Sequence, residues 1–255
     1  MEQPIHFYNQ QGEKLAGTLH LPDRPAGCGV VFGHCFTCSR HTRIIREICT
    51  ELAEKDVLAL RFDFSGNGQS EGEFSASNYS KQITEMQTAA TVIAEKGASR
   101  IGLAGHSMGA VIAVLTAART RTVKAVCALA GRLSGLNATH FFSKKQLKEL
   151  EDSGRVSFNS RGRSLQLSTK FFADAKQYDL PETVKLLEIP LMVVHGDADE
   201  VIPVQDAYLV KTLNPEYTEL IVIPGADHMF SAEIHRTQTS KLVVKWFKEH
   251  LHEPL

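Results

Sequence analysis

The sequence has almost no net charge and no long apolar run. Its 28 Lys and Arg nearly balance its 29 Asp and Glu, which gives a formal net charge of −1 at pH 7. Such a chain has no general electrostatic attraction for nucleic acid or for an anionic membrane. No stretch approaches the ~20 apolar residues that a membrane helix needs, and the N-terminus lacks the apolar core of a secretion signal. These absences predict a cytoplasmic protein with neither a nucleic-acid partner nor a membrane partner.

Cysteine is also scarce, with five residues in a chain of 255. An odd number in a chain of this size favours reduced thiols over a disulfide framework. What the chain does have is the composition of an ordinary globular protein, 43% hydrophobic and 22% charged. Its length suits one large α/β domain with an insertion, so we expect a single domain over 1–255. The composition leaves a homodimer open.

Strand-like and helix-like segments alternate along most of the chain. Short alternating runs at the start predict an antiparallel hairpin, and later apolar runs are typical of buried strands separated by amphipathic helices. The expected strands are 5–9, 15–21, 28–32, 57–62, 101–104, 124–130, 191–195 and 218–223, and the expected helices include 42–55, 78–95 and about 231–250. This order predicts an α/β fold with a mostly parallel central sheet flanked by helices. Ligand sites are then expected at the carboxyl ends of the strands.

The pentapeptide Gly105-His-Ser-Met-Gly109 joins the strand at 101–104 to an apolar, helix-like segment. In such a G-x-S-x-G pattern the serine occupies a sharp, strained turn, and the two glycines let strand and helix approach without Cβ clashes. The hydroxyl of Ser107 is then held out at the carboxyl end of the sheet. The free N–H of Met108, at the start of the helix, would face an oxyanion formed beside it. The pattern predicts that Ser107 is a nucleophile.

A G-x-S-x-G pattern also occurs by chance, and a nucleophilic serine needs a base together with a group that orients the base. Asp199 and His228 each follow one of the last two predicted strands. Both therefore belong to the same rim of the sheet as Ser107, in the chain order Ser, Asp, His that accompanies this turn. Asp197 is a rival acid because it is only two residues away, although we prefer Asp199. The predicted catalytic residues are Ser107, Asp199 and His228.

With these residues the chain resembles the α/β-hydrolase superfamily, and within it the cinnamoyl/feruloyl esterases and the serine-aminopeptidase-like hydrolases. The resemblance rests on His-Cys-Phe-Thr at 34–37, Arg-Phe-Asp-Phe-Ser-Gly-Asn-Gly-Gln-Ser at 61–70, and the motifs at 105–109, 195–203 and 225–228. It covers nearly the whole chain outside one insertion. The loop at 34–37 also resembles the hydrolase portion of bacterial proteins in which such a domain is fused to an osmotically induced, peroxide-handling domain.

The loop at 34–37 is expected to complete the oxyanion hole, with the backbone N–H of Phe36 acting beside that of Met108. Cys35 stands where the family usually has glycine, which puts the geometry of the loop in doubt. A metal site is an alternative because four nitrogen or sulfur ligand types gather here: His34, Cys35, Cys38 and His41. A redox C-x-x-C pair is another alternative. We expect neither, because the loop must also supply an oxyanion donor, and the resemblance implies no metal and no organic cofactor.

The pattern changes at about 132–188, which predicts a cap inserted between the sixth and seventh strands of the sheet. It has a charged helix near 144–151 and a hairpin that turns at 159–162. Nine basic and four acidic residues lie between Arg132 and Lys176. This excess of positive charge is either an ordinary solvated surface or a means of attracting anionic or phenolic substrates. The cap also contains two aromatic pairs, Phe141 with Phe142 and Phe171 with Phe172. They either stack on a planar acyl group of the substrate or only hold the cap on the sheet.

We therefore expect a serine esterase whose small-molecule substrate carries a small to medium acyl group or an aryl group of cinnamoyl type. The reaction would pass through an acyl-enzyme on Ser107. An amide or peptide hydrolase with the same three residues is the first alternative. A non-catalytic, ligand-binding member of the fold is the second, because a fold does not fix a function.

Overall fold

The computed structural model describes residues 1–24, 27–136, 139 and 142–251. Its centre is an eight-stranded sheet with the order β1-β2-β4-β3-β5-β6-β9-β10. The N-terminal hairpin β1–β2 is antiparallel and joins β4 antiparallel, whereas all other neighbouring strands of this sheet run parallel. The strands are β1 (Glu2–Tyr8), β2 (Lys14–His20), β3 (Cys28–Gly33), β4 (Leu58–Phe62), β5 (Arg100–His106), β6 (Val123–Leu129), β9 (Leu191–Gly196) and β10 (Thr218–Ile223). The predicted mostly parallel sheet is thus confirmed.

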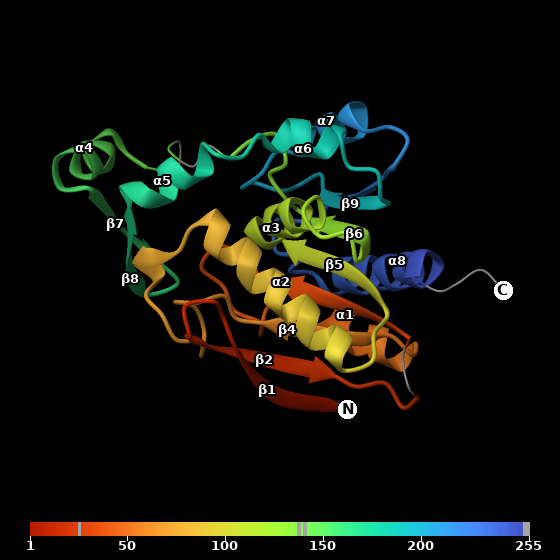
Figure 1. Ribbon diagram of the computed structural model, residues 1–255. Coiled ribbons are helices and arrows are strands. Elements are labelled where there is room, and N and C mark those ends of the chain that lie inside the picture. Colours follow the sequence, from red (N-terminus) through yellow and green to blue (C-terminus); the bar gives the residue numbers. More distant parts are fainter. Residues whose placement is uncertain (25–26, 137–138, 140–141, 252–255) are drawn as a thin grey trace.

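Helices cover both faces of this sheet (Figure 1). On one face α1 (Arg43–Glu54) and α8 (Glu233–Leu251) enclose one apolar core, and α1 buries residues at the predicted three-to-four spacing. On the other face lie α2 (Tyr79–Glu95), α3 (Met108–Ala117), α6 (Leu180–Lys185) and α7 (Gln205–Leu213). α3 is apolar all round, and its residues from Gly109 to Ala117 are buried. Such a helix has to lie between layers, which fixes its first turn firmly against the sheet.

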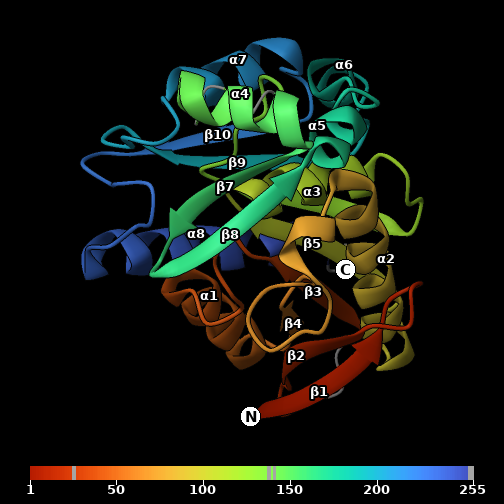
Figure 2. The ribbon, with the colours of Figure 1, turned by 90° about the vertical axis from the view of Figure 1, so that its left-hand side faces the viewer.

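The described part of the chain between β6 and α6 forms a separate layer beyond the carboxyl ends of the central strands (Figures 1 and 2). It contains α4 (Lys144–Ser153), the hairpin of β7 (Arg155–Ser160) and β8 (Arg163–Ser168), and α5 (Thr169–Ala175). The hairpin turns at Arg161 and Gly162, both with positive φ (52° and 74°), as a two-residue turn between twisted strands requires. This turn lies within the predicted one, and we call the layer the cap.

The cap is attached to the sheet domain by polar and aromatic contacts. The carboxylate of Asp174 in α5 accepts from the backbone N–H of Ser80 in α2 at 2.9 Å and from its hydroxyl at 2.5 Å. The ring of Phe171 is buried and lies 5.2 Å from that of Tyr79. These contacts hold the cap over the edge of the sheet where the predicted catalytic residues lie. Over the described ranges, none of the helices combines the length and apolarity needed to cross a bilayer.

Candidate active site

Ser107 occupies a strained turn between β5 and α3, with φ 56° and ψ −116°. Its N–H donates to the carbonyl of Leu129 at 2.8 Å, which ties the turn to the end of β6. A Cβ on Gly105 would overlap the backbone of Gly109, and a Cβ on Gly109 would overlap the carbonyl of Gly33 at the end of β3. The close approach of these three backbones therefore requires glycine on both sides of the serine, as the motif predicts.

Three side chains from three loops form one hydrogen-bonded line at the carboxyl edge of the sheet. The hydroxyl oxygen of Ser107 lies 3.1 Å from Nε2 of His228, and Nδ1 of the same ring lies 2.8 Å from Oδ2 of Asp199. The carboxylate of Asp197 instead accepts from the backbone N–H of Gly225 at 2.6 Å. Asp199, rather than Asp197, thus has the position that orients the imidazole. A base within hydrogen-bond distance of a serine and held by a carboxylate can remove the proton of the hydroxyl.

The side chain of Asp199 is buried, and each of its carboxylate oxygens has two hydrogen-bonding neighbours. Oδ1 accepts from the N–H groups of Val201 and Ile202, each at 2.8 Å. Oδ2 accepts from His228 and also lies 3.2 Å from Nε2 of His195, a fully buried ring. Burial by itself raises the pKa of Asp199, but the hydrogen bonds from His195, His228 and Ile202 outweigh it and hold the pKa well below its usual range. The acid is therefore ionised throughout the range in which a histidine base operates.

A second histidine, His106, lies next to His228 and contacts it. Its Nε2–H donates to the backbone carbonyl of His228 at 2.7 Å, and the two rings lie 5.0 Å apart. Burial, followed by the charge of His228, lowers the pKa of His106 to about 3. His106 therefore stays neutral near neutral pH and positions the loop of His228 without competing for its proton. The sequence pattern assigns no role to His106 or His195, since both lie inside strands and resemble ordinary core residues.

The loop after β3 is held by the ring of His34. Its Nδ1–H donates to the carbonyl of Cys35 at 2.7 Å, and its Nε2 accepts from the N–H of Phe64 at 3.0 Å. The N–H of Phe36, in this loop, and that of Met108, the first residue of α3, donate to no other group of the described chain. Two free N–H groups are thus available where the sequence predicts an oxyanion hole.

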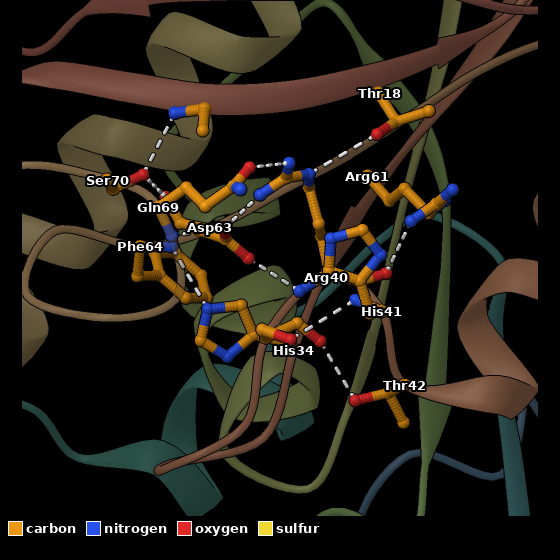
Figure 3. A network of polar contacts seen from close by, with 12 residues as sticks. Thr18, His34, Arg40, His41, Thr42, Arg61, Asp63, Phe64, Gln69 and Ser70 are labelled. Atoms are coloured by element: carbon orange, nitrogen blue, oxygen red, sulfur yellow. Dashed lines mark hydrogen bonds and ion pairs between the residues drawn. The ribbon is translucent and has the colours of Figure 1, made fainter. Parts of the chain in front are cut away.

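A buried network of polar side chains holds the loop after β3 in place (Figure 3). Asp63, fully buried at the end of β4, accepts from the backbone N–H of Arg40 at 2.6 Å, from its guanidinium, and from the N–H of Gln69 at 2.9 Å. Arg61 donates from Nη1 to the carbonyl of Arg40 at 2.9 Å. A buried charge pair is stable only where its remaining hydrogen bonds are also made, which restricts it to one geometry. The network therefore fixes the path of the chain between β3 and α1.

The expectation that all cysteines are reduced is wrong for one pair. Cys35 and Cys38 form a disulfide, with their Cα atoms 5.2 Å apart, while Cys28, Cys49 and Cys127 are buried. An odd number of cysteines does not show which of them lie close together in the fold. The tight turn of this loop brings Cys35 and Cys38, three residues apart in the sequence, within the distance that a disulfide spans. Within the described chain, no group of three or more His, Cys, Asp or Glu side chains is arranged to hold a metal ion.

A cavity of about 700 Å³ opens in front of Ser107, and we call it the main cavity. Of the predicted aromatic residues, Phe142 and Phe171 line it, whereas Phe172 lies behind them, with its ring 6.0 Å and 5.4 Å from theirs. The fourth, Phe141, falls outside the described residues. Among the lining residues that were not predicted as side-chain contacts are Phe36, Tyr79, Leu136 and Phe158. Only the position of Phe158 in the predicted hairpin gave a signal, and it did not show which face of the hairpin turns inward.

The chain is similar in sequence to one protein family and to a curated protein. Residues 30–150 match the family model described as serine aminopeptidase, S33. A curated protein of Salmonella typhimurium, the uncharacterized protein YfhR, is 24% identical over 203 residues, which cover 78% of this chain and 63% of that protein. The chain thus spans less than two thirds of the length of this relative.

Two solved structures are similar over nearly the whole chain. Est1E from Butyrivibrio proteoclasticus, with ferulic acid bound, superposes with a TM-score of 0.85 at 22% identity and covers 98% of this chain and 100% of that one. The esterase domain of a Rhodothermus marinus protein has a TM-score of 0.76 at 21% identity, covering 99% and 100%. At these identities the likeness establishes the fold. Fold, family model and the G-x-S-x-G turn agree, and the chain has the α/β-hydrolase fold.

Proposed function

We propose that the chain is a serine hydrolase that cleaves carboxylic esters with small to medium acyl groups or aryl groups of cinnamoyl type. The observation that supports this most directly is the hydrogen-bonded line from Ser107 through His228 to Asp199, which opens onto the main cavity. No step of this chemistry requires a metal or an organic cofactor.

The reaction would begin when His228 takes the proton of Ser107 as its oxygen attacks the ester carbonyl. The N–H groups of Phe36 and Met108 are then the donors for the oxyanion, and Asp199 stabilises the imidazolium and holds its tautomer. His228 next protonates the leaving alcohol, so that an acyl-enzyme remains on Ser107. A water molecule activated by the same ring releases the acid and restores the serine.

The residues that line the main cavity favour a substrate with an aromatic or short acyl group. The rings of Phe36 and Phe158 lie nearly parallel, with an angle of 6° between their planes and 6.0 Å between their centres. Phe142 and Phe171 add further apolar surface. Aromatic walls favour a planar group, which can pack its face or its edge against them. Est1E, a structure of the same fold, holds ferulic acid, a planar aromatic acid.

An amide or peptide hydrolase is the second candidate, because the matching family model is described as a serine aminopeptidase. A free amino terminus is a cation and would be recognised by a carboxylate. Among the described residues that line the main cavity there is no Asp or Glu, while Arg132 and Arg161 are present. This lining supports an ester more than it supports a peptide with a free amino terminus.

The test combines covalent labelling with a substrate panel. A fluorophosphonate probe should label the wild-type protein, and Ser107→Ala should abolish the label. The panel compares ethyl butyrate, ethyl ferulate, a sixteen-carbon acyl ester and an aminoacyl amide by kcat/KM. Faster turnover of the amide would favour the peptidase, faster turnover of the long-chain ester would contradict the proposed size range, and absence of labelling would favour a non-catalytic protein.

A further inference from the structure

A second hollow of about 320 Å³ adjoins the main cavity, and we call it the basic hollow. Its walls come from the loop after β3 and from the turn of the β7–β8 hairpin. Thr37 and Arg161 line both spaces, so the hollow begins where the main cavity ends. Besides these two, its polar lining includes Ser39, His41, Thr42 and Arg163.

Neither guanidinium of the basic hollow has an acidic partner in the described chain. Arg163 donates from Nη2 to the carbonyl of Thr37 at 3.0 Å, and Nη2 of Arg161 lies 3.7 Å from Sδ of Met229. Each guanidinium carries five N–H donors, so most remain available. The two arginines buried beneath the same loop differ, because Arg40 pairs with Asp63 and Arg61 pairs with Glu2.

The hollow adjoins the loop of His228, the group that would protonate a departing alcohol. His228 has to face the leaving oxygen in order to protonate it, and Met229 follows His228 directly in the chain. The contact between Arg161 and Met229 places the first guanidinium beside this loop. With the acyl group in the aromatic main cavity, the adjoining basic hollow is the space we assign to the alcohol portion of a substrate.

We propose that the basic hollow binds an anionic group, a carboxylate or a phosphate, on the alcohol portion of the ester. This assignment rests on the proposed esterase function and deepens it. Guanidinium groups bind both oxyanions with paired, charge-assisted hydrogen bonds, and nearby hydroxyl groups can satisfy the remaining lone pairs. Because Arg161 is exposed and Arg163 is half-buried, salt screens the attraction, and we expect a preference of about tenfold rather than an absolute requirement.

The test uses two esters that share one acyl group and one scissile bond. These are 4-(cinnamoyloxy)benzoate, whose phenol carries a carboxylate, and 4-(cinnamoyloxy)benzamide, in which a neutral amide replaces the carboxylate. The ratio of their kcat/KM values, corrected for their rates of hydrolysis without enzyme, should be about ten for wild type and should fall in about 0.5 M salt. The double variant Arg161→Gln/Arg163→Gln should bring the ratio to about one. A third ester with a phosphate in place of the carboxylate shows which anion the hollow prefers.

Arg155→Gln is the control for a charge lost elsewhere on the same hairpin, because this exposed arginine lies at its other end. Its loss changes the net charge by one, as each of the single variants Arg161→Gln and Arg163→Gln does. Arg155→Gln should leave the ratio unchanged. A ratio of one in wild type, or a ratio that survives in the double variant, would overturn the proposal. Calorimetric titration of both esters into Ser107→Ala measures the same preference without turnover. Preferential binding without hydrolysis in wild type would support the hollow and refute the esterase, and equal or absent binding would refute the hollow.

Discussion

At the scale of single residues, Ser107 and His228 should act as one unit. Neither the nucleophile without its base nor the base without its nucleophile forms the acyl-enzyme, so Ser107→Ala, His228→Ala and the double variant should each lower kcat/KM by about 10⁴ to 10⁶. The measurement is steady-state hydrolysis of an activated aryl ester, with circular dichroism as the control for folding. Losses that add in the double variant would contradict the proposed roles.

The two neighbouring acids give a matched comparison. Asp199→Asn removes the carboxylate that holds His228 and should lower kcat by about 10⁴. Asp197→Asn changes a group that bonds only the N–H of Gly225 among the described residues, so its effect on kcat should be small. Both variants are compared with wild type on the same ester. The opposite ranking would make Asp197 the orienting acid.

At the scale of elements, the order of strands explains why much of the site was predictable. Parallel strands end at one rim, so a serine, an acid and a histidine that each follow such a strand had to lie on that rim. The G-x-S-x-G turn needs only local geometry, and it too follows from the sequence. The single domain over 1–255, the boundaries of the cap, the cytoplasmic location and any homodimer remain predictions.

What the sequence did not indicate depends on contacts between elements. Whether Phe158 of the hairpin and Phe172 of α5 face the main cavity depends on how the cap docks on the sheet domain. Contacts such as that between Thr37 and Ser160, whose hydroxyl oxygens lie 2.8 Å apart, contribute to this docking. The contact of His195 with the carboxylate of Asp199 depends on a bend of the chain after β9. Periodicity reports which face of an element is apolar and not which neighbour that face meets.

The cap aromatics should set the preference for the acyl group. Phe158→Leu removes a ring of the main cavity, so it should lower the ratio of kcat/KM for ethyl ferulate over ethyl butyrate by about tenfold, in line with the 0.5–1.5 kcal/mol of an aromatic pair. Phe172→Leu is the control, because it makes the same change in the cap behind the cavity wall. Equal effects of both substitutions would mean that the aromatic residues only hold the cap in place.

At the scale of the whole molecule, buried neutral histidines should make the protein sensitive to acid. Burial is the main reason that the pKa of His106 falls to about 3 and that of His20 to about 4, whereas an unfolded histidine titrates near 6.5. Between these values the unfolded chain binds more protons, so the free energy of unfolding falls as the pH falls. His106 alone should cost about 1 kcal/mol between about pH 7 and pH 5.5.

Urea unfolding across this range of pH measures the effect. The fall in stability should become shallower in His106→Gln, because glutamine takes up no proton, even if that variant is less stable at every pH. An unchanged slope would show that other groups carry the acid sensitivity. Asp199 acts at lower pH, since its lowered pKa contributes stability above about pH 4 that is lost on further acidification.

The left-handed backbone of Ser107 also has a consequence for how this chain evolves. Its φ of 56° and ψ of −116° are readily adopted by glycine but are unfavourable for serine or alanine. Ser107→Gly should therefore raise the melting temperature above that of Ser107→Ala, by the equivalent of about 1 kcal/mol, although glycine usually destabilises. Under the proposed function, selection for stability and selection for catalysis therefore oppose each other at this position. A lineage released from the need for catalysis would gain stability by losing its nucleophile.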